Sequence, residues 1–465
     1  MVDHLSGQLS SRKNLLMVAA LLVSVMSFML NASMLSPAIR DIETRLGDGS
    51  YAAMSAYFYL AGAVGNVVLI RWSDFIGRKR VLVAVLVVLC IGTVLCIFTA
   101  SLPLVLVGRM LQGISNVTYG LAFLIMREHL SAKAFGVAAG LITAMSGGVA
   151  GVDGLIGGYL SDRFGYQSIF VAILVVGVIA VVLCSAAVPA DDPDRVAPGR
   201  MDWAGAALIA MGVAGINLFF SSGDVSGWGS PLALGFIIAA TAALAALVVV
   251  EKRRTYPLVR MSDLRSREAW PVIAVTILNT GSFMMVTGFI VPYIAEDGDS
   301  GFGLSGFTTA LLFLTPAAVV QLITAPLAGR LAVRIGFVTL LRIGQLGAVV
   351  VTVLLALFLH DKTVFAILVV LFGCVYGGLA GTAMSILGVV QAPEDEPGSL
   401  PGISNAAYGV GLSLGFAWAG PIVGSGTASS FPTALWVCVC VGVVGFVVSL
   451  VMRPRVSSQA PASSA

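Results

Sequence analysis

Long apolar stretches, separated by short segments rich in charged and turn-forming residues, recur along the whole chain. A helix that crosses the hydrocarbon core of a bilayer needs about 20 consecutive apolar residues. About 14 stretches reach this length and predict membrane-spanning helices. They lie near residues 15–37, 52–71, 81–100, 103–125, 135–157, 168–189, 203–221, 230–250, 270–292, 307–328, 338–359, 364–389, 401–423 and 432–452.

The composition supports an integral membrane protein and excludes several other classes. Of the 465 residues, 58% are hydrophobic and only 11% are charged, whereas about a quarter are charged in soluble proteins. A formal net charge of +3 provides no basic face for nucleic acid. The six cysteines lack CxxC spacing and the three histidines lie at or outside the ends of apolar stretches. We therefore expect no metal, no cofactor and no enzymatic activity.

The distribution of basic residues predicts the orientation in the membrane. An even number of spans places both termini on one side. If that side is the cytoplasm, about 21 of the 26 lysines and arginines lie on cytoplasmic segments and about four lie outside, as the positive-inside rule requires. One loop that this orientation places outside, Glu296–Asp299, is purely acidic apart from a glycine. We expect a monomeric, multi-pass protein of the cell membrane with both termini in the cytoplasm.

A charged turn occurs twice. Asp74, Gly77, Arg78 and Lys79 follow the second span, where an acid at a helix end, a glycine and a basic cluster suit a tight cytoplasmic turn. A related turn that contains Arg334 follows the tenth span. This repetition predicts two related halves, as in many secondary transporters, and a conformational role for both turns.

These residues resemble motifs of the major facilitator superfamily. Asp74–Lys79 is similar to its signature loop, G-x-L-x-D-R-x-G-R-[RK], and Arg109–Gly113 to its R-x-x-Q-G motif. Gly147–Gly158 resembles the antiporter motif with a G-P-x-x-G-G core. Three further segments resemble the 14-span drug:proton antiporter branch: Gly199–Gly205, Gly227–Gly229 and Glu251–Leu258.

The resemblance implies an all-α integral membrane fold that works by alternating access. Two six-helix bundles, residues 1–190 and 269–453, would flank two inserted helices within residues 191–268. Residues 454–465, rich in serine and alanine, would form a disordered cytoplasmic tail.

Two charges lie well inside predicted spans, Arg109 and Asp153. Each unpaired charge at such a depth costs about 2.5 to 3.5 kcal/mol on insertion scales, so both are candidates for proton coupling. The alternative is structural, with Arg109 holding backbone carbonyls and Asp153 hydrogen-bonded within a packed helix pair. Arg109, Gln112, Gly113 and Asn116 follow the spacing i, i+3, i+4, i+7 and share one helical stripe.

Small and polar residues complete the candidate site. Helix packing, with rocking of the halves as its functional extension, is expected of Gln112, Gly113, Gly147, Gly151, Gly154 and Gly158. A substrate cavity, or alternatively hydrogen bonds between helices, is expected of Asn31, Asn116, Tyr119, Asn279, Asn405 and Tyr408.

Two transport functions follow from these features. The first is proton-coupled export of small amphipathic compounds such as drugs. The second is proton-linked uptake of a polar metabolite such as a nucleoside or sugar. Drug exporters of the resembled branch often carry an acid in span one, where this chain has Asn31, and no acid occurs between Leu400 and Val423 in span thirteen. Both hypotheses require a small-molecule substrate, protons and a lipid bilayer.

Overall fold

The computed structural model describes residues 12–191, 201–253, 269–391, 399–424 and 429–453, and all regular structure in these ranges is helical. The predicted tail, 454–465, lies outside the described residues. The first half contains α2 (Arg12–Ser33), α3 (Ile39–Leu46), α4 (Ser50–Ile76), α5 (Arg78–Phe98), α6 (Leu102–Gly113), α7 (Val117–His129), α8 (Ala132–Phe164) and α9 (Gln167–Ala187).

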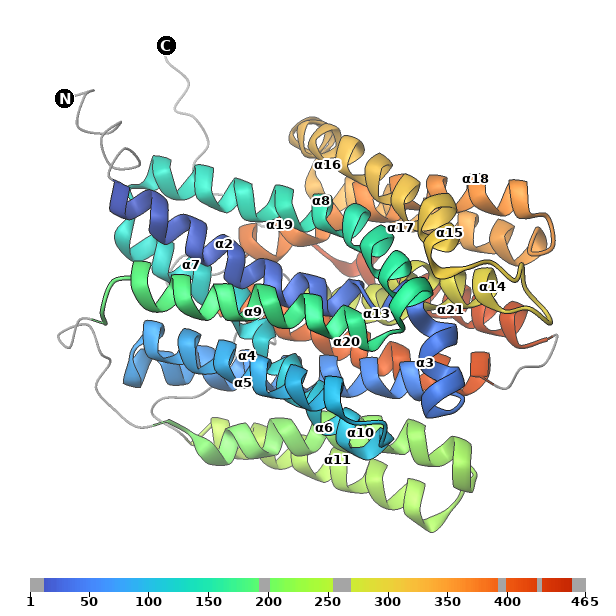
Figure 1. The fold of residues 1–465 in the computed structure, drawn as a ribbon, viewed down its shortest axis with the longest axis horizontal. Coiled ribbons are helices and arrows are strands. Elements are labelled where there is room, and N and C mark those ends of the chain that lie inside the picture. The colour runs from blue at the N-terminus through green and yellow to red at the C-terminus, as the bar shows by residue number, and fades with distance from the viewer. Residues whose placement is uncertain (1–11, 192–200, 254–268, 392–398, 425–428, 454–465) are drawn as a thin grey trace.

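A helical hairpin, α10 (Trp203–Ser226) and α11 (Pro231–Glu251), comes between the two halves in the sequence and lies along one edge of the bundle (Figure 1). The second half contains α13 (Trp270–Met285), α14 (Val291–Glu296), α15 (Gly306–Thr309), α16 (Thr315–Ile335), α17 (Phe337–Leu357), α18 (Lys362–Phe372), α19 (Thr382–Val390), α20 (Ser399–Gly424) and α21 (Ser430–Val451). Wider π-helical turns join α13 to α14, α15 to α16 and α18 to α19.

Twelve helical segments of the described chain are long and apolar enough to cross a membrane. The predicted stretches 103–125 and 135–157 are helical as well, but they are not among these twelve. The first is divided into α6 and α7 by a 3-10 turn at Ile114–Asn116, and the second lies within α8, which has 33 residues. The total of 14 spans, and the boundaries of the halves, therefore remain predictions.

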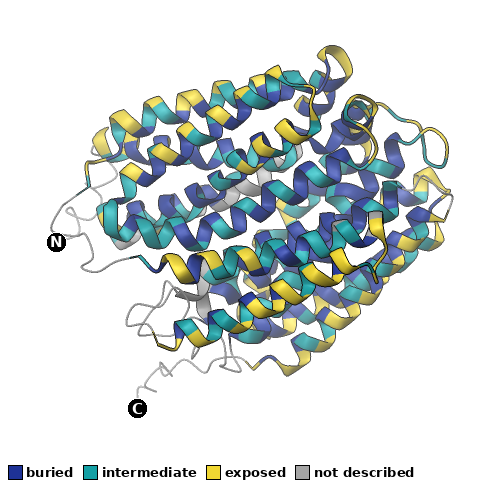
Figure 2. Ribbon diagram, turned by 90° about the horizontal axis from the view of Figure 1, so that it is seen from below, coloured by how far each residue is buried: buried dark blue, intermediate teal, exposed yellow. Residues whose placement is uncertain are grey.

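The surface of the helix bundle matches a lipid environment. Figure 2 shows buried residues along the inner helices and exposed residues on the periphery. Large apolar side chains are exposed in the middle of spans, for example Ile91, Val175 and Ile238. In water such a surface would be a liability, whereas in a bilayer it contacts acyl chains.

The two repeated turns have the same backbone conformation. Gly77 (φ +105°) ends α4 and begins α5, and Gly336 (φ +89°) ends α16 and begins α17. Residues that carry a Cβ atom rarely adopt these positive φ values. Glycine is therefore required at both positions. The similarity of the turns agrees with the repeat read from the sequence.

The halves pack closely along α4 and α20. An added Cβ at Gly409 would lie 3.1 Å from the Ala63 Cβ, and one at Gly420 would lie 2.5 Å from the Ala52 Cβ. The Ser413 hydroxyl on α20 donates to the Ala56 carbonyl on α4 (2.9 Å). The inserted hairpin joins this seam, because the Asn217 side chain on α10 donates to the Ser413 hydroxyl (2.7 Å).

Further contacts between the halves lie where α3, α14 and the start of α15 meet, which we call the α3 end (Figure 1). The hydroxyls of Ser36 and Tyr51 both donate to the Gly288 carbonyl, at 3.0 and 3.4 Å. The halves are therefore closed against each other at this end.

Candidate functional site

Arg109 lies at the centre of a buried polar cluster in the first half. Its side chain on α6 is only 2% exposed. The guanidinium donates to the side-chain and carbonyl oxygens of Asn31 on α2 and to Gln112 Oε1 (2.8 Å). Its Cζ lies 4.2 Å from the centre of the Phe58 ring on α4, within cation–π range. Gln112 in turn donates to the Thr93 hydroxyl on α5 (3.0 Å).

Asp153 lies on α8 and is 1% exposed. One carboxylate oxygen accepts a hydrogen bond from the Ser33 hydroxyl at the end of α2, while Oδ1 has no hydrogen-bond partner in the described part of the chain. None of the four ion pairs found among the described residues joins Arg109 to Asp153. The two charged residues instead bond to Asn31 and Ser33, which are two positions apart on α2. A rearrangement of this helix end would therefore reach both of them.

The second half contains an uncharged polar cluster. Asn279 on α13 is fully buried and accepts a hydrogen bond from the Gln345 side chain on α17 (3.0 Å). The Tyr376 hydroxyl donates to the Asn279 carbonyl (3.5 Å), and the Trp418 indole on α20 donates to the Gly281 carbonyl (2.9 Å). Within the described ranges, Gln345 Oε1 has no hydrogen-bond partner. This half thus offers amide and aromatic groups, a chemistry suited to neutral polar molecules.

The other residues predicted to line a substrate cavity are described here by their burial and packing contacts. Asn116 is 4% exposed and packs against Gly62 on α4. The Tyr119 ring on α7 contacts the Phe123 ring at 5.2 Å between centroids. Asn405 and Tyr408 are half-buried on α20. A role of these four residues in binding substrate remains a prediction.

The small residues permit close approach of helices at particular places. An added Cβ at Gly113 would lie 2.0 Å from the Phe58 carbonyl oxygen, and one at Gly158 would lie 2.5 Å from the Gly306 carbonyl carbon in the other half. At Gly154 an added Cβ would be in ordinary van der Waals contact, 3.7 Å from the Ala310 Cβ. Gly147 and Gly151 belong to α8, but the contacts at these two positions are outside what the structure describes.

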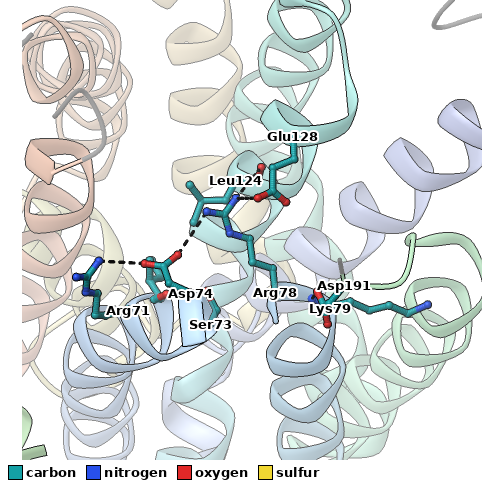
Figure 3. Close-up of polar contacts among 9 residues, drawn as sticks. Arg71, Ser73, Asp74, Arg78, Lys79, Leu124, Glu128 and Asp191 are labelled. Carbon is teal, nitrogen blue, oxygen red and sulfur yellow. Dashed lines mark hydrogen bonds and ion pairs between the residues drawn. The ribbon is translucent and has the colours of Figure 1, made fainter. Parts of the chain in front are cut away.

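The Asp74 turn forms a connected group of charges (Figure 3). Asp74 pairs with Arg71 (3.2 Å) and Arg78 (3.4 Å), and Arg78 pairs with Glu128 on α7 (2.5 Å). Arg78 also donates to the Leu124 carbonyl (3.4 Å). These pairs tie α4, α5 and α7 together. In the second turn the side chain of Arg334 is exposed.

A further acid completes this turn. The Asp191 carboxylate, after α9, accepts hydrogen bonds from the backbone amides of Lys79 (2.8 Å) and Arg80 (3.1 Å). It therefore caps the first turn of α5. The Lys79 ammonium donates to the Val188 carbonyl (2.6 Å), which ties the end of α9 to the start of α5.

Sequence reasoning missed several of these partners. Ser33, Thr93 and Phe58 are ordinary residues of apolar stretches, and no local signal marks them. Sequence reasoning also did not single out two buried acids. Glu296 ends α14 and is 3% exposed, and Glu43 on α3 is 8% exposed. Both acids are covered by the opposite half, a contact that no sequence pattern records.

An all-helical fold with twelve candidate spans, two related turns and buried polar clusters defines a membrane carrier. The sequence profile of the Major Facilitator Superfamily matches residues 21–416 and, in a second alignment, 272–465. The chain belongs to this superfamily.

Curated relatives include transporters of different substrates. The chain is 32% identical over 414 residues to a uridine/deoxyuridine transporter of Lactococcus lactis, covering 86% of this chain and 85% of the relative. It is 24% identical to the multidrug resistance protein Stp of Mycobacterium tuberculosis (89% and 76% covered). It is 23% identical to the quinolone resistance protein NorB of Staphylococcus aureus (94% and 96% covered).

Solved structures share the fold at low identity. A D-xylose-proton symporter superposes with a TM-score of 0.68 at 15% identity, covering 95% of this chain and 98% of that one. The nucleoside transporter NupG superposes with a TM-score of 0.62 at 13% identity, with 94% and 100% covered. These likenesses establish the fold and leave the substrate open.

Proposed function

We propose that this protein is a proton-coupled carrier that takes up a nucleoside by alternating access. The observation that carries the proposal is the 32% identity, over 86% of the chain, to a uridine/deoxyuridine transporter. The uncharged cluster around Asn279 and Gln345 supports it, because amides can pair with the donor and acceptor groups of a nucleobase. Aromatic rings such as Tyr376 and Trp418 can pack against its face.

The distribution of acids argues against recognition of cationic drugs. Cation binding in a membrane cavity favours a carboxylate, and Leu400–Val423 contains none. The buried acid in the first half, Asp153, is bonded to Ser33. We assign proton transfer to Asp153. Arg109 would remain positively charged, and movement of α2 would change its hydrogen bonds to Asn31.

The orientation and the energy source belong to the proposal. The positive-inside count places the α3 end outside and the Asp74 turn in the cytoplasm. One proton crossing about 100 mV releases about 2.3 kcal/mol, enough for a roughly fiftyfold substrate gradient. We propose a monomer that needs no cofactor, because each half contributes its own cluster and the proton gradient supplies the work.

Drug export is the second candidate. It is supported by the similarity to Stp and NorB over most of the chain and by the inserted helices α10 and α11. In that function the same Asp153 would exchange a proton for substrate moving outward.

Direction of transport separates the two candidates. Purified protein is reconstituted into proteoliposomes. Cleavage at a protease site added to the C-terminus measures the fraction of molecules in each orientation. Labelled uridine should accumulate when the side bearing the α3 end is made acidic, and a proton ionophore should abolish accumulation. Asp153→Asn should lose the response to the gradient, and Asp299→Asn, an exposed acid, serves as the control. Accumulation of a quinolone in inverted vesicles with an acidic lumen, without uridine transport, would favour drug export instead.

A further inference from the structure

Two buried acids lie at the closed α3 end, one from each half. Glu43 lies on α3 in the first half, and Glu296 ends α14 in the second half. The mechanism proposed above uses neither of them. Both are more than nine-tenths buried, although acids are almost never buried without a role or a partner.

Glu296 reaches across the seam to the start of α3. Its Oε2 accepts a hydrogen bond from the Arg40 backbone amide (3.1 Å), and the Arg40 guanidinium donates to the Glu296 carbonyl (3.1 Å). The other carboxyl oxygen, Oε1, is buried and has no hydrogen-bond partner among the residues that the structure describes. A buried acceptor of this kind is costly as part of a carboxylate and is relieved when the group binds a proton.

Glu43 approaches the second half from the opposite side. Its Oε1 accepts a hydrogen bond from the Gly49 amide (3.2 Å), and Tyr293, one turn before Glu296, donates its hydroxyl to the carboxyl group. Burial raises the pKa of Glu43, which lies outside the candidate spans, to about 7. Among the described residues, the other charged groups that act on the two acids are Arg40, Asp48 and Asp162, so two further acids stand against one cation.

A third carboxylate shows that this arrangement belongs to the closed state. Asp162, at the end of α8 in the first half, accepts hydrogen bonds from the backbone amides of Gly306 (3.1 Å) and Phe307 (3.0 Å) in the second half. Thus Asp162 caps the helix that begins at Gly306, and Glu296 caps α3 in return. Separation of the halves at this end breaks both caps and exposes the acids to water.

We propose that Glu43 and Glu296 form a second proton-binding site, separate from Asp153, which loads when the α3 end closes and unloads when it opens. The physical basis is burial: closure removes water from both carboxyl groups and leaves Glu296 Oε1 unpaired. In the open state both carboxyl groups are in contact with water, and the pKa of Glu43 is no longer raised by burial.

The direction of the effect follows from linkage. A carboxyl group whose pKa is raised in the closed state stabilises that state when protonated, and this contribution disappears as the pH rises through the raised pKa. One proton taken up on closure changes the closed-to-open ratio by up to about tenfold per pH unit. Under the proposed orientation, an acidic exterior would then favour closure of the outer side, which is the step that an importer needs after loading.

The test measures opening of the α3 end without substrate. Ser36, which is 6% exposed and bonded across the seam, is replaced by cysteine in a variant whose six native cysteines are alanine. Purified protein in lipid nanodiscs is reacted with a maleimide at pH values from about 6 to 9. Each rate is divided by the rate for the same protein in detergent-denatured form at that pH, which removes the intrinsic pH dependence of the thiol.

We expect the normalised rate to fall as the pH falls, by up to about tenfold per unit near neutrality. Glu43→Gln with Glu296→Gln should give a rate that does not vary with pH, and each single variant should show a reduced slope. Asp299→Asn in the neighbouring loop should behave as the parent. A flat parent profile, or an unchanged slope in the single and double variants, would overturn the proposal. Because nanodiscs expose both sides and no substrate is present, this result is independent of the proposed transport function.

Discussion

Replacing Arg109 by lysine tests whether the first-half cluster needs a guanidinium or only a positive charge. The guanidinium donates to Asn31 and Gln112 while it stacks on Phe58. A lysine keeps the charge, but its ammonium cannot hold this planar arrangement. We therefore expect Arg109→Lys to impair transport almost as severely as Arg109→Ala.

The magnitude follows from the interactions that a lysine cannot make. One charge-assisted hydrogen bond contributes about 1.5–3 kcal/mol, and a desolvated cation–π contact contributes about 2 kcal/mol. Removal of one such bond and weakening of the ring contact amount to about 3 kcal/mol, or about a hundredfold in an equilibrium. Transport of labelled uridine into proteoliposomes under a proton gradient should fall by up to this factor.

Two measurements accompany this assay. Arg163→Lys, at an exposed arginine of α8, should transport like the parent. Size-exclusion chromatography and thermal melting of each variant show whether a loss of transport reflects misfolding. Transport by Arg109→Lys within a few fold of the parent, with Arg109→Ala inactive, would refute the argument and show that charge alone is required.

Further predictions concern the seam, the proton and the Asp74 turn. Gly158→Ala should hinder closure of the α3 end, because its Cβ would lie 2.5 Å from the Gly306 backbone. Gly154→Ala should not, because its Cβ would lie 3.7 Å from its nearest neighbour. Faster maleimide labelling at the α3 end in Gly158→Ala, and not in Gly154→Ala, checks this. Asp153→Asn should fold normally but lose gradient-driven accumulation, and an unchanged pH dependence of transport would exclude it as the proton carrier. Asp191→Ala should lower the free energy of unfolding by about 0.5–2 kcal/mol through removal of a helix cap, measured by thermal melting, while Asp191→Asn should retain most of it.

Local patterns made much of the fold predictable. A span needs only a continuous apolar stretch, and a charged turn with a glycine of positive φ is encoded within a few residues. For this reason the predicted stretches coincide with helices, and the turns at Gly77 and Gly336, each preceded by isoleucine, have similar φ values. The break at Ile114–Asn116 was not predictable, since no proline or charge marks it.

The candidate site was predictable only in part. Arg109 and Asp153 stand out because charges are rare in spans, but their relation to each other depends on how α2, α6 and α8 pack. The sequence permitted a direct ion pair between them. The structure instead places Asn31 beside one and Ser33 beside the other, and serine within an apolar stretch carries no signal of its own.

The membrane environment, the repeat, the superfamily motifs and the scarcity of charge within spans can be read from the sequence, since each of these is a property of residues close together in the chain. Which of the other acids are buried depends on how the two halves pack. Arg40 and Glu296 are 256 positions apart, and their contact exists because the two halves close on each other at the α3 end. Burial by a distant segment changes the chemistry of a carboxyl group without changing any local pattern.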